Sequence, residues 1–128
     1  MLSAHGTFAV ISKESGEAIG SIGIFETDAK GAESGEPELG FWIGKPYWGK
    51  GLIPEAAHAL LSYCFDTLGS RRVWCAYFDG NEKSRRCQEK CGFLPHHTEE
   101  VFWEPTGENK MTNFMTLTKE RFDAMRKS

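Results

Sequence analysis

Short apolar runs in the first third of the chain alternate with polar residues and predict β-strands. Residues 7–11 are β-branched and aromatic, and residues 18–25 place alternate side chains on two faces. The polar turn at 14–17 joins them into a predicted hairpin. A polar, glycine-containing loop over 26–37 then leads to a third predicted strand over 38–43.

The middle of the chain changes to a helical period. Pro54 suits the first turn of a helix, and Gly69 suits its end. A strand over 72–78 follows, and then a helix over about 82–91 with Asn81 as its N-cap. The stripe that predicts the first helix consists of Ala57, Leu60, Leu61, Cys64, Phe65 and Leu68.

The last third predicts two more strands and a short final helix. The strands lie near 98–103 and 111–117, with a turn over 104–110, and the helix opens at 118–120. The complete order is β-β-β-α-β-α-β-β-α, a mixed sheet with helices in the α+β class. A length of 128 residues predicts one domain over 1–128.

Composition narrows the class of protein further. The net charge of −3 argues against a nucleic-acid-binding face, and the apolar runs are too short to span a membrane. There is no secretion signal at the N-terminus, so we expect a cytoplasmic protein. The four cysteines form no C-x-x-C pair, which predicts reduced, packed thiols and no metal site.

A glycine-containing turn, Trp48-Gly49-Lys50-Gly51-Leu52-Ile53, joins the third strand to the first helix. Free N–H groups and the dipole at a helix N-terminus favour an anion. The two glycines let the backbone approach a diphosphate closely, and Lys50 adds positive charge. The turn is therefore a candidate phosphate-binding site.

Two nucleotide motifs are close to this turn but do not fit it. Residues 44–50 satisfy G-x-x-x-x-G-K, yet Gly51 stands where a P-loop needs Ser or Thr for magnesium. The dinucleotide pattern G-x-G-x-x-G fails because Pro54 occupies its third glycine. An ordinary strand–helix connection remains the alternative.

Three segments resemble GNAT acetyltransferases, in particular the RimJ/RimL-like branch that acetylates ribosomal proteins. Residues 46–56 resemble that branch's Y-W-G-K-G-x-A-x-E-A, and residues 81–93 resemble N-x-x-S-x-x-x-x-E-K-x-G-F. Residues 38–43 resemble its E-L-G-Y-x-I strand. The resemblance implies an N-terminally short GNAT-like acyl-CoA N-acyltransferase fold, because the family has a further strand and a helix pair before the first hairpin.

The resemblance also implies where acetyl-CoA binds. The cofactor would lie in a splay between the 38–43 strand and the 72–78 strand, with its pantetheine arm added like a strand. Its pyrophosphate would meet the N–H groups of the glycine turn. The implied cofactor contacts are Phe41, Trp42, Ile43, Trp48, Gly49, Lys50, Gly51, Leu52, Ile53, Asn81, Ser84 and Arg86.

Each candidate catalytic group also has a structural interpretation. Glu38 could deprotonate the acceptor amine, or it could be a solvated strand residue. Ser84 could donate a hydrogen bond to the leaving sulfur, or it could help to cap its helix. Tyr47 and Tyr77 are alternative donors, and Gln88 stands where many relatives have a tyrosine acid.

The predicted function is transfer of an acetyl group from acetyl-CoA to a primary amine, either a protein N-terminus or a small amine, by direct attack. One alternative is an acetyl-CoA-binding module without transferase activity. Another is a structural protein whose turn binds no anion. We expect no metal, nucleic acid or membrane partner, and an exposed first strand would favour a homodimer.

Overall fold

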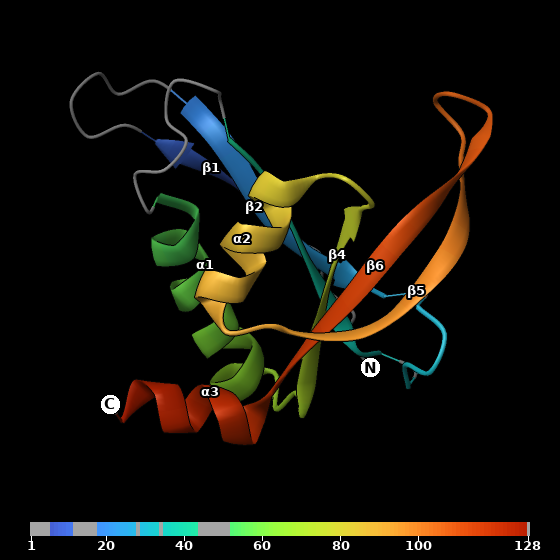
Figure 1. The fold of residues 1–128 in the computed structure, drawn as a ribbon. Helices are drawn as coiled ribbons and strands as arrows, with labels where there is room; N and C mark the ends of the chain where they lie inside the picture. The colour runs from blue at the N-terminus through green and yellow to red at the C-terminus, as the bar shows by residue number, and fades with distance from the viewer. Residues whose placement is uncertain (1–5, 12–17, 28, 34, 44–51, 128) are drawn as a thin grey trace.

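The computed structural model describes residues 6–11, 18–27, 29–33, 35–43 and 52–127. These residues form one six-stranded sheet with its helices gathered on one side (Figure 1). The elements are β1 Gly6–Ile11, β2 Ala18–Glu26, β3 Pro37–Ile43, α1 Leu52–Ser62, η2 Tyr63–Thr67, β4 Arg72–Phe78, α2 Glu82–Cys91, β5 Leu94–Trp103, β6 Glu108–Thr118 and α3 Lys119–Arg126.

The strands lie in the order β1-β2-β3-β4-β6-β5. Among the described strands, β3 and β4 form the one parallel pair, and every other neighbouring pair is antiparallel. A parallel pair requires a crossover, and the segment that contains α1 provides it. The predicted element order and mixed sheet are confirmed.

The main core lies between the helix-covered face of the sheet and the helices. Leu39 of β3 and Cys75 of β4 point to this face, where they pack against Leu61 of α1 and Cys91 of α2. Phe122 brings α3 into the same cluster. Because side chains alternate between the two faces along a strand, the sequence neighbours of Leu39 and Cys75 point to the other face.

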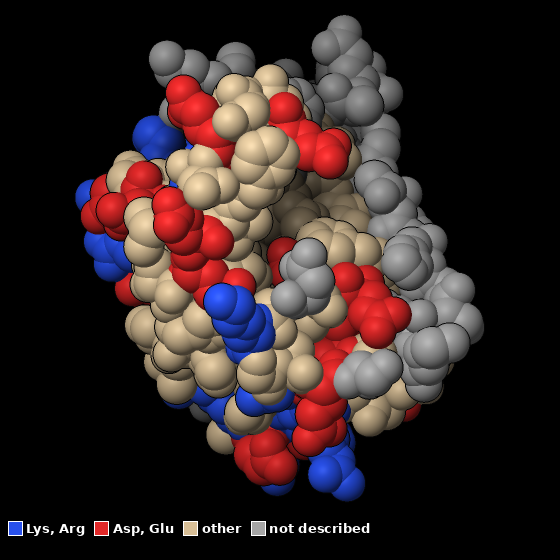
Figure 2. Space-filling model, turned by 90° about the vertical axis from the view of Figure 1, so that its right-hand side faces the viewer, with Lys and Arg blue, Asp and Glu red and all other residues tan. Residues whose placement is uncertain are grey.

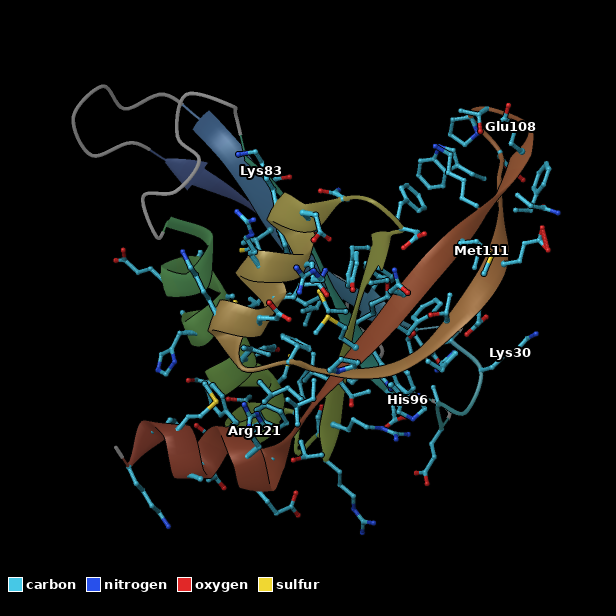
Figure 3. All side chains as sticks on the ribbon, viewed as in Figure 1. Lys30, Lys83, His96, Glu108, Met111 and Arg121 are labelled. Carbon is cyan, nitrogen blue, oxygen red and sulfur yellow. The ribbon has the colours of Figure 1, made fainter. Side chains whose placement is uncertain are left out.

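A second cluster of apolar residues forms on that other face. Trp74 of β4 and Phe114 of β6 pack there with Ala29, which belongs to the segment between β2 and β3. Glu36 fixes this segment to β4, because Arg72 Nη2 lies 2.7 Å from its Oε1 and Trp74 Nε1 lies 3.1 Å away. Figure 3 labels Lys30 and His96 on this side, where a Cβ built on Gly31, next to Lys30, would lie 3.6 Å from His96 Cε1.

The helix ends follow the predicted capping residues. The Asn81 side chain accepts a hydrogen bond from the Ser84 N–H, and Gly92 ends α2 with a φ of 102°. Gly69 follows the first helical segment with a φ of 71°. That segment closes in a π-helical turn, η2, which the apolar stripe did not predict.

Two predicted boundaries in the last hairpin are wrong. β5 begins at Leu94 rather than at 98, and its register against β6 shifts between Pro95 and His97. β6 begins at Glu108 rather than at 111, because the turn is already complete at Gly107, with a φ of 69°. Pairing with β6 determines both boundaries, and the apolar pattern does not report that pairing.

Candidate functional site

The parallel pair of strands separates part-way along its length. β3 and β4 pair through Glu38 with Trp74 and through Leu39 with Cys75, and no residue pair follows. Yet β3 continues to Ile43 and β4 continues to Phe78. We call the gap between residues 40–43 and 76–78 the fork. The resemblance implied a splay between these two strands, and the fork lies there.

Two side chains bind backbone carbonyls where the ladder stops. Cys75 Sγ donates to the carbonyl oxygen of Leu39 at 3.3 Å. Gln88 Nε2, from α2, donates to the carbonyl oxygen of Ala76 at 2.8 Å. Because buried carbonyls need partners, these two bonds let the strands part without leaving either carbonyl unpaired.

A chain of hydrogen bonds runs from the fork to the start of α2. Gln88 Nε2 also donates to Ser84 Oγ at 3.2 Å. The Ser84 N–H in turn donates to Asn81 Oδ1 at 3.2 Å. The cap uses the oxygen of the Asn81 amide, which leaves its Nδ2 group as the donor that a ligand could meet.

Glu38 lies at the closed end of the fork, on the face away from the helices. It is paired with Trp74 and is half-buried. Thr27 Oγ1 donates to Glu38 Oε1 at 2.7 Å, and the Ala29 N–H donates to Thr27 Oγ1 at 3.2 Å. The segment after β2 therefore holds the Glu38 carboxylate in place.

The two predicted catalytic residues lie on opposite faces of the sheet. Ser84 belongs to α2, which covers the main core, whereas Glu38 points to the face of Trp74. Glu38 borders the end of the β3–β4 ladder from one face, and Ser84 is linked to it from the other face through Gln88, which binds Ala76. The arrangement can accept a proton on one side and donate a hydrogen bond on the other.

Tyr77 is a further donor at the fork. It is half-buried and packs against the main core, two residues beyond the last paired residue of β4. Burial raises its pKa, with smaller contributions from the carboxylates of Glu82, Glu89 and Asp79, while Arg85 opposes them. A phenol in these surroundings stays protonated at neutral pH and can act as a hydrogen-bond donor.

The remaining predicted cofactor residues are described to different extents. Phe41 is half-buried against the main core, and Arg86 is exposed on α2. For Trp42, Ile43, Leu52 and Ile53 the backbone alone is described, and α1 begins at Leu52. Residues 48–51 lie outside the described residues.

The side of the molecule that carries β5 and β6 has a hollow (Figure 2). Acidic side chains lie around it, and basic side chains are fewer there. The described part of the chain contains no cluster of metal-ligating side chains. None of its helices is both long and apolar enough to cross a membrane.

The sequence did not predict three hydrogen-bonding side chains in this site: those of Thr27, Cys75 and Gln88. Their contacts join segments that are distant in sequence, so local pattern could not reveal them. Gln88 had one signal, because it is a polar residue one helical turn after Ser84, on the side of α2 that carries Cys91.

These features match a known family. The family described as acetyltransferase (GNAT) domain matches residues 2–94, which is well over half of the chain. The chain therefore belongs to the GNAT acetyltransferase domain family.

Individual relatives agree with this assignment. The putative ribosomal N-acetyltransferase YdaF of Bacillus subtilis is 38% identical over 79 residues, which cover 62% of this chain and 42% of the relative. Human alpha/beta-tubulin-N-acetyltransferase 9 is 35% identical over 111 residues, which cover 78% of this chain and 53% of the relative. The chain thus spans about half the length of these curated relatives.

Solved structures share the fold. The ribosomal-protein-S5-alanine acetyltransferase of Vibrio fischeri superposes with a TM-score of 0.76 at 19% identity, over 91% of this chain and 62% of that one. A probable acetyltransferase superposes with a TM-score of 0.71 at 31% identity, over 83% of this chain and 57% of that one. The GNAT-like fold predicted from the three motifs is confirmed.

Proposed function

We propose that this chain binds acetyl-CoA in the fork and transfers the acetyl group to a primary amine. The observation that carries the proposal is the end of the β3–β4 ladder after Leu39 and Cys75, directly beside the start of α2. An extended ligand can enter such a gap without breaking an existing strand pair.

The pantetheine arm of acetyl-CoA suits the β3 side of the fork. Residues 41–43 have no partner residues on β4, so their backbone groups can pair with the amides of the arm. The pyrophosphate would then reach residues 48–53, where α1 begins and the helix dipole favours negative charge. Asn81 Nδ2 would donate to the arm from the other side.

The proposed reaction is direct attack of the amine nitrogen on the thioester carbon. The new C–N bond forms, the C–S bond breaks, and the amine proton must leave. A lysine-type amine has a pKa of about 10.4 and is mostly protonated at neutral pH, so a base accelerates the step. Glu38, held by Thr27, would accept this proton directly or through water.

Two further groups would stabilise the developing charges. A backbone N–H at residue 42 or 43 would donate to the oxyanion of the tetrahedral intermediate. Ser84 would donate to the sulfur as it leaves, and Tyr77 is the alternative because it is protonated and also lies at the fork. Neither step requires a covalent intermediate on the protein.

We propose that the acceptor is cationic, either a protein N-terminus or a small amine. The acidic surroundings of the hollow in Figure 2 and the net charge of −3 favour such an acceptor. An α-amine, with a pKa of about 7.7–8.0, loses its proton more easily than a lysine side chain. The relatives named above include acetyltransferases of ribosomal proteins and tubulin.

The test is release of free thiol from acetyl-CoA with a panel of amines and N-terminal peptides. We expect Glu38→Gln to lower kcat/KM by about 10²–10⁴-fold at pH 7 and by less at higher pH, where the amine deprotonates unaided. Glu108→Gln, at the exposed start of β6, is the matched control and should behave as wild type.

An unchanged pH profile in Glu38→Gln would remove Glu38 as the base. Binding of acetyl-CoA without thiol release for any amine would favour the alternative, a cofactor-binding module without transferase activity. No binding at saturating acetyl-CoA would contradict both.

A further inference from the structure

One buried polar atom near the fork has no hydrogen-bond partner. Gln88 is 1% exposed, in the middle of α2. Among the buried side-chain nitrogen and oxygen atoms of the described residues, its Oε1 is the one without a partner. A buried acceptor without a donor costs free energy, so a specific reason for it is expected.

The orientation of the Gln88 amide follows from its neighbours. The carbonyl oxygen of Ala76 can only accept, so it must face Nε2, which it does at 2.8 Å. The second hydrogen of Nε2 goes to Ser84 Oγ at 3.2 Å. Flipping the amide would place two acceptors against each other, and Oε1 is therefore left unpaired beside the fork.

The same amide determines what the Ser84 hydroxyl can do. A hydroxyl has one hydrogen to donate, and Ser84 Oγ already accepts from Gln88. Within the described part of the chain we find this hydroxyl only as an acceptor. Its hydrogen therefore remains available for a group outside the hydrogen-bond chain from Ala76 to Asn81.

We infer that Gln88 is a positioning residue for Ser84 and a ligand-binding group in its own right. Its Nε2 holds Ser84 as a donor toward the fork, and its Oε1 accepts an N–H from a ligand in the fork. This inference rests on the proposed binding of acetyl-CoA, whose pantetheine arm has two amide N–H groups. One of these would pair with Oε1 and satisfy it.

Binding measurements separate this role from a purely structural one. Gln88→Met keeps the length and apolar volume of the side chain but removes both polar atoms. We expect it to weaken acetyl-CoA binding about tenfold, the loss of about one buried hydrogen bond. Binding of 3′,5′-ADP, which lacks the pantetheine arm, should be unchanged. Lys90→Gln, on the exposed side of α2, is the control and should change neither.

Kinetics test the link to Ser84. Ser84→Ala and Gln88→Met should each lower kcat by about tenfold, and the double variant should lose no more than either one, because both remove the same donor. Additive losses in kcat would overturn the positioning role. KM for the amine should stay unchanged in all three.

A spectroscopic measurement on the wild-type chain avoids dependence on any variant's folding. The two Nε2 hydrogens of Gln88 should shift in NMR spectra on addition of acetyl-CoA but not of 3′,5′-ADP. If wild type binds acetyl-CoA while these signals stay still and Gln88→Met binds equally well, the inference about Gln88 is wrong and the proposed function survives. If wild type binds no acetyl-CoA, the proposed function itself fails.

Discussion

At the scale of single residues, the four cysteine thiols differ in their pKa. Their spacing in the sequence does not predict this difference. Burial raises the pKa of Cys64 to about 11, and burial together with the charge of Glu38 raises that of Cys75. Cys87 is half-buried, and a hydrogen bond from the Cys91 thiol lowers its pKa, as does Lys90, against the effect of burial. We therefore expect Cys87 to be the most reactive of the four thiols.

Thiol labelling tests this ranking. With iodoacetamide at pH 7.5, we expect Cys87 to react first and the buried Cys64 and Cys75 to react only on unfolding. Peptide mass mapping over time identifies the labelled residue, and Cys87→Ser should remove the fast phase. First labelling of Cys64 or Cys75 would contradict the packing described for the main core.

Gly92 is a position where the backbone requires glycine. Its φ is 102°, and a Cβ there would overlap Met125 Sδ and lie 2.7 Å from Met125 Cε. We expect Gly92→Ala to lower the free energy of unfolding by about 2–3 kcal/mol. Gly107 has a φ of 69° with open space around it, so Gly107→Ala should cost about 1 kcal/mol.

Urea unfolding of both variants measures the difference. Because both replacements force a side chain into positive φ, the excess cost at Gly92 reports its more strained φ together with the displacement of Met125. Equal costs at the two glycines would mean that neither the more positive φ nor the displacement of Met125 adds strain at Gly92.

At the scale of elements, a cluster of aromatic and charged side chains joins the start of β5 to the segment between β2 and β3. The His96 ring lies 4.7 Å from that of Trp74, and the His97 ring stacks on Phe114 at 5.2 Å. His97 Nε2 contacts Glu99, whose Oε2 also accepts from the Lys30 N–H at 2.9 Å.

This cluster predicts a loss of stability in weak acid. Partial desolvation lowers the pKa of His96 below its ordinary value of 6.5 although the residue is exposed, with further contributions from His97 and Arg72, against Glu36. The unfolded chain therefore binds this proton more readily. Stability is retained above pH 6.5 and is lost as the pH falls below it.

Urea unfolding between pH 7.5 and 5 checks this prediction. His96→Phe keeps a ring on Trp74 but cannot be protonated, so its stability should fall less over this range. Parallel profiles for wild type and His96→Phe would exclude His96 as the source.

A second loss of stability is expected below about pH 4.5, and the same measurement continued to lower pH checks it. Arg72, the Glu33 N–H and Trp74 hold the pKa of Glu36 below 4.5 despite its burial.

Element boundaries show what the sequence can predict. The bounds of β4 and α2 matched the prediction, because Asn81 and Gly92 mark both ends of α2 and β4 is an uninterrupted apolar run after Arg72. The start of β5 did not match, because Pro95 and His96 show no alternation and only the pairing with β6 extends the strand.

The site could be predicted in part. The motif at residues 38–43 predicted one strand of the fork, and the motif at residues 81–93 includes both residues that cap α2. The other strand, over 72–78, was predicted from its apolar residues and lies outside the three motifs. The contacts of Thr27 with Glu38, of Cys75 with Leu39 and of Gln88 with Ala76 could not be predicted, because each depends on the packed sheet.

At the scale of the whole molecule, the order of elements determines where a ligand can enter. The crossover through α1 makes β3 and β4 parallel neighbours, and α2 then covers the end of β4. The fork lies between them, with the main core on one face and the cluster around Trp74 on the other. The proposed cofactor site is thus a consequence of topology as well as of individual residues.

Hydrogen exchange with and without acetyl-CoA measures whether the cofactor binds in the fork. We expect slower amide exchange on binding in residues 38–43 and 76–85, which border the fork, and no change in β1 or α3, which lie away from it. Protection confined to β1 or α3, or saturable binding with no change at 38–43 and 76–85, would contradict binding in the fork.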